Sequence, residues 1–256
     1  MSKKKIIAKK IAVAAKASKS KTVKSKTVPF ATSKTKTSAA KVIPFNPSKI
    51  KAVLFDADNT LFPTREIAKD CDEQALKRFE EEGADHKQVL LAFYDLVGKL
   101  SNEDDIQKRS RQYSYPILAK KFGITPQVAA DAANEFRELV LSKIAPYPSA
   151  RRFIEKLQKH YSVRLAVVTC AERDWALKKL EAAGLMDFFD VIVTTSDTGK
   201  MKPHPSYYTL ACKQLKVNPK DCVMIGDSEE HDLAPARKVG MHAFLADYEK
   251  LEELFP

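Results

Sequence analysis

The chain has only seven glycines among 256 residues, and none of them belongs to a nucleotide-binding loop. Neither the G-x-G-x-x-G pattern of dinucleotide-binding domains nor the G-x-x-x-x-G-K pattern of P-loops occurs. Long apolar runs are also missing, because no stretch approaches the roughly 20 residues that cross a bilayer. The sequence therefore favours neither of these nucleotide-binding classes, and no membrane partner is expected.

Cysteine is scarce and dispersed along the chain. The four copies form no C-x-x-C pair and lie at positions 71, 170, 212 and 222. This spacing fits neither a zinc site nor a disulfide framework, and it indicates a reducing compartment. A cytoplasmic location is expected, with association to a nucleoid or nucleus as the alternative that the N-terminal charge suggests.

Acidic residues are absent from the first 55 positions, which hold fifteen lysines and no arginine. The remaining positions hold 29 basic and 33 acidic residues, so the N-terminal part alone accounts for the net charge of +11. Residues 1–48 show no sustained amphipathic period, which predicts a disordered Lys-rich tail. A polycation of this kind can bind nucleic acid without reading its sequence. A targeting peptide and a solubilising extension are the alternatives.

The first acidic residue, Asp56, follows a short apolar run at residues 50–55 that predicts a buried strand. Asp58 comes two positions later, in the sequence Asp-Ala-Asp-Asn-Thr. Open α/β sheets place their chemistry at the carboxyl ends of strands. There one carboxylate can attack a substrate while the other moves a proton. Taken alone, the motif favours an ordinary turn, because Asp and Asn commonly form turns after strands.

Three further polar groups follow in the chain. A strand-like run at residues 163–168 ends in Thr169. Lys202 lies in the sequence Lys-Pro-His-Pro, before a predicted helix. A third strand-like run at 222–225 is followed by Gly-Asp-Ser, which contains Asp227, and Asp232 lies five residues after Asp227. An acid pair, a hydroxyl, a lysine and an acid cluster are the groups that phosphoryl transfer through an aspartyl phosphate requires.

In these four motifs, and in their order, the chain resembles the haloacid dehalogenase superfamily over residues 50 to 247. The resemblance implies a Mg²⁺-dependent hydrolase with a Rossmann-like core. Members that dehalogenate carbon lack the second acid, so the presence of Asp58 indicates a phosphatase. The expected substrate is a small phosphomonoester such as a sugar phosphate, phosphoglycolate or a nucleotide.

Three other functions stay open at this point. The protein could be a nucleotide or nucleic-acid-end phosphatase recruited by its tail, a non-catalytic nucleic-acid binder, or a phosphomutase, which shares the same motifs.

The resemblance also implies a role for each motif residue. Asp56 is expected to be the nucleophile and Asp58 the general acid and base. Thr169, Cys170 and Lys202 are expected to bind phosphate, although many relatives carry Asn at the position of Cys170. The expected Mg²⁺ ligands are Asp56, the backbone carbonyl of Asp58, Asp227 and Asp232. Asp232 is alternatively an N-cap of the following helix.

The rest of the pattern predicts an α/β fold, a doubly wound parallel sheet with helices on both faces. Helix-like segments at 65–82, 86–100, 103–122 and 126–144 come first, and strands and helices alternate after residue 146. We expect a catalytic core at 49–63 and 146–256 and an inserted helical domain at 64–145, similar to the C1-type cap of the superfamily. Candidate residues for a second anionic group of the substrate are Thr64, Arg65, Arg109, Arg111, Gln112 and Tyr113.

Overall fold

The computed structural model describes residues 45–101, 103 and 105–256. The predicted disordered tail at 1–48 lies outside the described residues up to position 44. Phe45 is part of the fold, because its ring packs edge-on against Phe244 and Phe255 at centroid distances of 5.1 and 5.5 Å. Residues 47–49, which follow Phe45 in the chain, form a short 3₁₀ helix. The start of the folded part therefore lies at or before Phe45, earlier than the predicted boundary.

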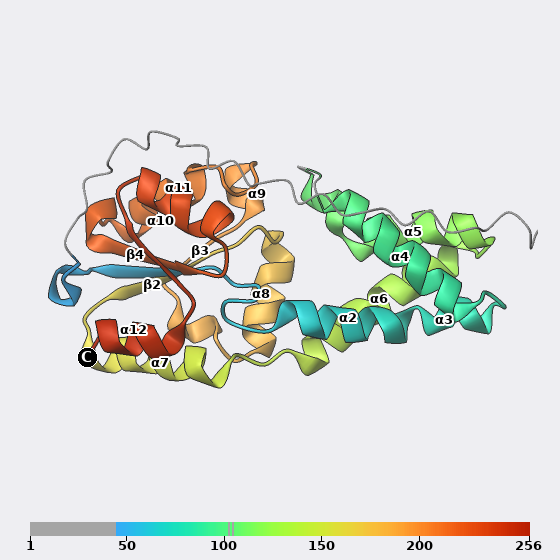
Figure 1. Cartoon of the computed structure of the whole chain (residues 1–256), viewed down its shortest axis with the longest axis horizontal. Coiled ribbons are helices and arrows are strands. Elements are labelled where there is room, and N and C mark those ends of the chain that lie inside the picture. Colours follow the sequence, from blue (N-terminus) through green and yellow to red (C-terminus); the bar gives the residue numbers. More distant parts are fainter. Residues whose placement is uncertain (1–44, 102, 104) are drawn as a thin grey trace, which may run out of the picture. The chain divides into compact units, whose positions relative to one another are not determined.

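A five-stranded sheet with the order β3-β2-β1-β4-β5 forms the centre of the fold (Figure 1), and all of its strand pairs are parallel. The strands are β1 (Ala52–Phe55), β2 (Arg164–Val168), β3 (Val191–Val193), β4 (Cys222–Gly226) and β5 (His242–Leu245). The central strand β1 is fully buried, as expected where helices cover both faces of a parallel sheet. The predicted parallel sheet is confirmed.

Alternate residues of β1 serve two separate hydrophobic cores. Val53 and Phe55 face the side covered by α7 (Pro148–His160), α8 (Arg173–Ala182) and α12 (Tyr248–Leu254). Ala52 and Leu54 face the side covered by α10 (Ser206–Leu215) and α11 (Ala234–Lys238). Figure 1 shows α7 and α12 on one side of the sheet and α10 and α11 on the other. The sheet is therefore doubly wound.

Most of the segment between β1 and β2, up to the start of α7, forms a separate block, which we call the helical insertion (residues 64–143). Its helices are α2 (Thr64–Ala75), α3 (Lys77–Glu81), α4 (His86–Leu100), α5 (Arg111–Phe122) and α6 (Pro126–Lys143). They pack around a hydrophobic core of their own. Side chains cap three of these helices at their N-termini, where Asp85, Ser110 and Thr125 accept hydrogen bonds from backbone N–H groups.

A buried ion pair lies inside the helical insertion. The Arg111 guanidinium donates two hydrogen bonds to the Asp72 carboxylate, and the Tyr115 hydroxyl donates a third at 2.7 Å. The side chain of Asp72 is only 2% exposed. Burial raises the pKa of Asp72, although Arg111 and Tyr115 oppose this shift. The pair joins α2 to α5 in the interior of the insertion.

Several predicted helices differ in their bounds. The segment 65–82 is divided at Leu76 into α2 and α3, and 103–122 is a short turn (Ile106–Arg109) followed by α5. The helix predicted at 231–239 is a π-type turn (Glu229–Leu233) that leads into α11. The sequence did not predict α9 (Thr195–Thr198) or α12. Among the described residues, no helix combines the length and apolar character needed to cross a membrane.

Candidate active site

The carboxyl ends of three adjacent strands carry the polar residues of the sequence motifs. In the register, Phe55 of β1 lies beside Val167 of β2 on one side and Ile225 of β4 on the other. Asp56 follows β1 directly, and Thr169 and Asp227 follow the ends of β2 and β4. Residues that are far apart in the sequence thus reach one edge of the sheet, as the motif spacing predicts.

Lys202 reaches this edge from the loop before α10. Its ammonium group donates hydrogen bonds to Oδ1 of Asp56 at 2.6 Å and to Oδ1 of Asp232 at 2.7 Å. The Lys202 side chain is 2% exposed, and such a charge is tolerated in the interior only when it is paired. Burial alone would lower the pKa of Lys202, but the two carboxylates raise it well above its usual value. The lysine is therefore a fixed positive charge at the site.

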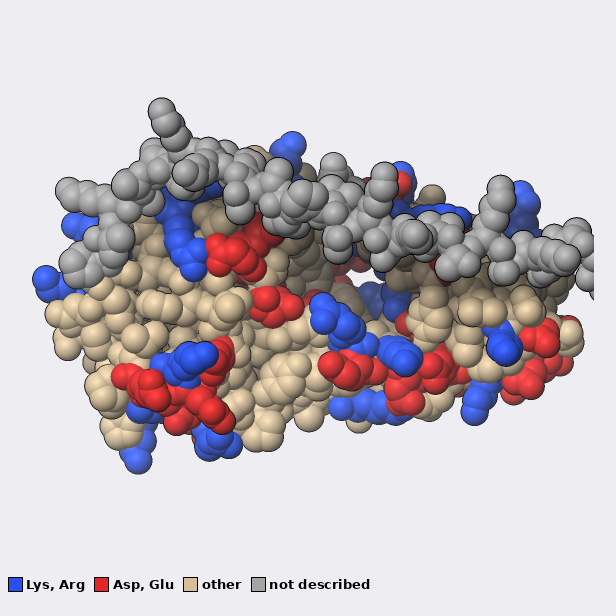
Figure 2. Space-filling view, in the orientation of Figure 1, with Lys and Arg blue, Asp and Glu red and all other residues tan. Residues whose placement is uncertain are grey.

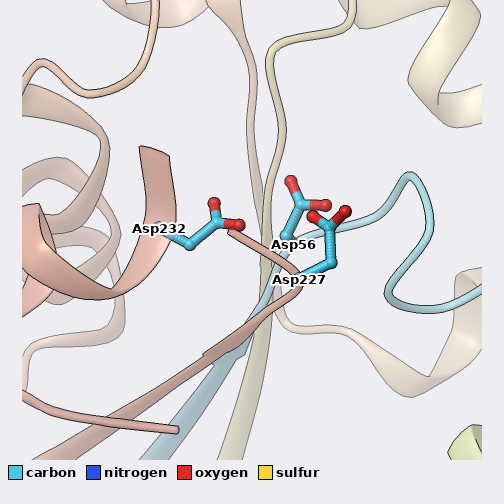
Figure 3. A group of neighbouring side chains, drawn as sticks. All are labelled: Asp56, Asp227 and Asp232. Carbon is cyan, nitrogen blue, oxygen red and sulfur yellow. The ribbon is translucent and has the colours of Figure 1, made fainter. Parts of the chain in front are cut away.

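Asp56, Asp227 and Asp232 form a cluster of carboxylates (Figure 3), with one oxygen of each within 4.8 Å of the others. Burial raises the pKa of Asp56 to about 7, with Lys202 opposing the shift and Asp232 and Asp58 adding to it. Burial and the nearby Asp232 also raise the pKa of Asp227. Three carboxylates face one ammonium group, so the cluster carries excess negative charge. Oxygen ligands of this kind suit a hard divalent cation.

The loop after β4 fixes Asp232. Its Oδ2 atom accepts a hydrogen bond from the backbone N–H of Ser228 at 3.1 Å, and its side chain lies against Gly226. A Cβ atom at position 226 would lie 2.5 Å from Oδ2 of Asp232, so only glycine fits there without a shift. The alternative role of Asp232 as an N-cap is wrong. Ser228 caps the turn Glu229–Leu233 by accepting a hydrogen bond from the His231 N–H, and the N-cap of the following helix α11 is Leu233.

The hydrogen bonds of the Asp58 side chain are made outside the carboxylate cluster. Its Oδ1 atom accepts hydrogen bonds from the Thr64 hydroxyl at 2.6 Å and from the ammonium group of Lys179. Burial would raise the pKa of Asp58, but the charge of Lys179 and the two hydrogen bonds hold it below its usual value. The next residue, Asn59, has a positive φ of 61° and accepts a hydrogen bond from the Arg65 N–H. This turn connects the motif to the start of α2.

Thr169 and Cys170 lie at the end of β2. The Thr169 side chain is buried, and its hydroxyl oxygen accepts a hydrogen bond from the Ala171 N–H at 3.2 Å. The Cys170 sulfur accepts a hydrogen bond from the Lys202 N–H at 3.3 Å, so this cysteine anchors the loop that carries the lysine. Burial raises the pKa of the Cys170 thiol.

A pocket of about 600 Å³ opens beside Asp58, within the size range of small-molecule sites. It is lined from both the core and the helical insertion. Of the candidate residues for a second anionic group, all but Arg65 line it: Thr64, Arg109, Arg111, Gln112 and Tyr113. The Arg111 guanidinium is already engaged by Asp72, which makes it a poor partner for a substrate.

The sequence did not single out three further residues of this pocket. They are Arg137 of α6 and Trp175 and Lys179 of α8. Trp175 offered a partial signal in the sequence, because it is the only tryptophan of the chain. Lys179 gave only a weak signal, because its helical spacing from Ala176 and Leu180 places it on the apolar face of α8 although lysines ordinarily face solvent.

Comparison with known proteins agrees with this architecture. A family model described as haloacid dehalogenase-like hydrolase matches residues 50–240. A ribulose-1,5-bisphosphate 5-phosphatase of Halopiger xanaduensis is 29% identical over 202 residues, which cover 77% of this chain and 84% of the relative. A glyceraldehyde 3-phosphate phosphatase of Methanopyrus kandleri is 27% identical over 205 residues, covering 75% and 82%.

A solved structure gives the same result for the fold. The HAD phosphatase of Thermococcus onnurineus matches with a TM-score of 0.59 and 26% identity, covering 76% of this chain and 85% of that one. The family model covers well over half of the chain, and the relatives are named phosphatases. The resemblance seen in the four motifs is thereby confirmed, and the chain belongs to the haloacid dehalogenase-like hydrolases, as a phosphatase of that family.

Proposed function

We propose that the protein is a Mg²⁺-dependent phosphomonoesterase that transfers the phosphoryl group of a small metabolite to Asp56 and then to water. The observation that carries this proposal is the convergence of Asp56, Lys202, Asp227 and Asp232 at one edge of the sheet. A carboxylate nucleophile, a buried cation and a group of oxygen ligands lie together there, and Asp58 follows two residues after the nucleophile.

The carboxylate cluster offers oxygen donors that suit Mg²⁺. Its three carboxylates carry more negative charge than Lys202 offsets, and their oxygens lie close enough to share one ion. Asp56, Asp227 and Asp232 would hold the ion together with the backbone carbonyl of Asp58. When bound, Mg²⁺ supplies positive charge that neutralises the phosphoryl oxygens and screens the carboxylates from the substrate.

In the first step, a carboxylate oxygen of Asp56 attacks phosphorus and the bond to the leaving oxygen breaks. Asp58 gives its proton to that oxygen, and the substrate leaves as an alcohol. In the second step, Asp58 takes a proton from water, the water oxygen attacks phosphorus, and inorganic phosphate leaves Asp56. This division splits one difficult hydrolysis into two easier displacements.

Two groups would hold the transferring phosphoryl group, which carries a charge of about −1.5 to −2 at neutral pH. Lys202 contacts Asp56 directly, so its ammonium group would also lie beside a phosphoryl group bound to that carboxylate. Thr169 and the backbone N–H groups after it would donate hydrogen bonds to the equatorial oxygens. Cys170 supports the site through its contact with the Lys202 backbone.

The leaving group would occupy the pocket beside Asp58. That pocket lies between the core and the helical insertion, so the insertion would act as a cap that selects the substrate. Relatives are named for ribulose bisphosphate, glyceraldehyde phosphate and phosphoglycolate. A small phosphorylated metabolite is therefore the substrate class that we propose.

A panel of phosphomonoesters tests the proposal, with release of inorganic phosphate measured in Mg²⁺, in Ca²⁺ and in EDTA. Activity should require Mg²⁺, and Ca²⁺ should restore it poorly, because its larger and looser coordination shell misplaces the nucleophile. A mutase would convert the substrate to an isomer without releasing phosphate. Full activity in EDTA would refute the metal assignment.

A second candidate function concerns the N-terminal lysines. The first 55 residues carry fifteen lysines and no acid, which favours binding to nucleic acid through charge alone. The face of the molecule in Figure 2 shows acidic and basic side chains interspersed over the described residues, without a large basic area. Nucleic-acid binding would then depend on the N-terminal segment, and the phosphatase could act on nucleotides or nucleic-acid ends recruited by it.

A further inference from the structure

Arg137 and Trp175 face the pocket beside Asp58 and have no part in the proposed phosphoryl transfer. Arg137 lies on α6 of the helical insertion, and Trp175 lies on α8 of the core. The Cζ atom of the Arg137 guanidinium lies 4.8 Å from the centre of the Trp175 ring, which is a cation–π contact. The two residues therefore form one wall of the pocket across the boundary between insertion and core.

The Arg137 guanidinium has donor groups to spare. Its contact with the indole is made through Cζ, and none of its N–H groups donates a hydrogen bond among the described residues. Among the described residues, no carboxylate pairs with Arg137, although its side chain is half-buried. A half-buried cation without a counter-ion at a pocket wall is suited to receive an anion.

Three other cations line the pocket. Arg109 donates a hydrogen bond to the backbone carbonyl of Glu103, and the other two differ from Arg137 because carboxylates pair with them. Arg111 is held by Asp72, and Lys179 is held by Asp58. Their charges are thus compensated within the protein. Arg137 adds positive charge to the pocket that a bound ligand can neutralise.

Arg137 also lies at a suitable distance from the reacting groups. The Nζ atom of Lys179 is 5.9 Å from the centre of the same Trp175 ring, and it contacts Asp58. The separation of Arg137 from Lys179 is therefore no greater than the sum of the two distances to the ring centre. A short carbon chain can span this distance, so one ligand can reach both the proton donor and the Arg137 guanidinium.

We propose that the leaving group of the substrate carries a second anionic group, a phosphate or a carboxylate, which binds Arg137 where it contacts Trp175. This inference rests on the proposed function, because it assigns the substrate class of the same site. Arg137 would be a specificity-determining residue, since its bidentate hydrogen bonds with an oxyanion are available only to substrates that carry one.

A kinetic experiment tests this on the full-length protein. Release of phosphate is measured from fructose bisphosphate, phosphoglycerate, glycerol phosphate and p-nitrophenyl phosphate, which present a phosphate, a carboxylate, a neutral polyol and a neutral aromatic leaving group. The wild-type protein should have its highest kcat/KM with fructose bisphosphate or phosphoglycerate. Arg137→Met should lower the ratio of kcat/KM for that substrate to kcat/KM for p-nitrophenyl phosphate by about 10- to 100-fold, mainly through KM.

Two further variants separate specificity from structure. Arg137→Lys keeps the charge and should restore part of the lost ratio. Arg78→Met removes an arginine of the same insertion that pairs with Glu135 and does not line the pocket, so it should leave the ratio unchanged. A wild type without preference for an anionic leaving group, or an Arg137→Met variant that lowers both activities equally, would overturn the proposal.

A binding measurement decides the question even if no substrate is turned over. Trp175 is the only tryptophan of the chain, so its fluorescence reports on this pocket alone. In an Asp56→Asn background, fructose bisphosphate or phosphoglycerate should change the fluorescence at lower concentration than glycerol phosphate. Adding Arg137→Met should raise the apparent Kd for the anionic ligand by about 10- to 100-fold. Equal responses to all three ligands, or an unchanged Kd, would contradict the inference, whereas a failure of the proposed function would appear only as missing phosphate release.

Discussion

The ammonium group of Lys179 donates a hydrogen bond to Oδ1 of Asp58, and the two residues are 121 positions apart in the sequence. The Lys179 side chain is 2% exposed, and its Nζ atom lies 5.5 Å from the centre of the Phe62 ring. The same carboxylate oxygen accepts the Thr64 hydroxyl. These contacts hold one oxygen of Asp58, and no hydrogen bond engages the other oxygen among the described residues. The second oxygen is therefore the one that can exchange a proton with the leaving group and with water.

The first prediction concerns Lys179. Replacing it in Lys179→Met frees Asp58 to rotate, so proton transfer to poor leaving groups should slow. Alkyl phosphates need that proton and p-nitrophenyl phosphate hardly does, so the ratio of their kcat values should fall. The fall should be smaller than in Asp58→Asn, where general acid–base catalysis worth about 10²- to 10⁴-fold is lost.

Lys178→Met is the matched control, because Lys178 is exposed and pairs only with Asp174 one turn earlier. It should leave the ratio of the two kcat values as in wild type. An equal loss on both substrates in Lys179→Met would mean that the lysine supports the fold and does not position Asp58.

The second prediction concerns Gly226. A Cβ atom there would lie 2.5 Å from Oδ2 of Asp232 and 2.6 Å from its Cβ, so Gly226→Ala must displace the whole Asp232 side chain. That displacement would break its contact with Lys202 and disturb the carboxylate cluster. Activity should fall at least tenfold, and the Mg²⁺ concentration for half-maximal activity should rise.

Gly98→Ala provides the comparison, since Gly98 lies in the exposed part of α4 and an added Cβ meets nothing within 4 Å. It should keep full activity and raise the free energy of unfolding by roughly 0.5–1 kcal/mol, because alanine favours the helix. Unchanged activity and Mg²⁺ dependence in Gly226→Ala would show that the position of Asp232 is unimportant.

The third prediction concerns the ion pair inside the helical insertion. Asp72→Asn leaves the Arg111 charge buried without a carboxylate, so the free energy of unfolding should fall by about 3–5 kcal/mol. Urea denaturation measures this change. Asp70→Asn, in the same helix, removes an exposed pair with Lys143 and should change the stability little. Equal stability of the two variants would contradict the structural role given to Asp72.

The strands and the motif residues at their ends could be predicted from the sequence, because each strand of the sheet interior is a short apolar run followed by a polar residue. The runs before Asp56, Thr169 and Asp227 are of this kind, and parallel strands bring their carboxyl ends to one edge. The predicted helix bounds were less accurate where packing against neighbouring elements determines where a helix ends. Leu76 interrupts the first helix of the insertion although the periodicity continues through it.

The pocket could not be predicted in the same way. Arg137 and Trp175 meet only because α6 packs beside α8, and neither local sequence encodes that contact. Lys179 differs from its exposed neighbour Lys178 only in its position on the buried face of α8. The final helix α12 was overlooked since Tyr248 and Leu251 are its only buried residues. Contacts between distant elements determine these features.

The fourth prediction concerns the N-terminal segment. Deletion of residues 1–42 spares Phe45, which packs on the core, and every proposed catalytic group, so kcat on p-nitrophenyl phosphate should not change. The same deletion should remove most binding to duplex DNA, because residues 56–256 hold more acidic than basic side chains. Gel shifts at two salt concentrations measure this, with a log–log slope of roughly −0.9 per neutralised phosphate for the full chain. A full-length protein that fails to bind at low salt would rule out the nucleic-acid function.

The nucleophilic role of Asp56 can be measured directly. The protein is mixed with a turned-over phosphomonoester and Mg²⁺, quenched in acid during turnover, digested and analysed by mass spectrometry. The account predicts one phosphoryl group on the peptide that contains Asp56, and neither that adduct nor turnover in a folded Asp56→Asn variant, since an amide is a poor nucleophile. Near-wild-type turnover by Asp56→Asn would contradict the aspartyl-phosphate mechanism.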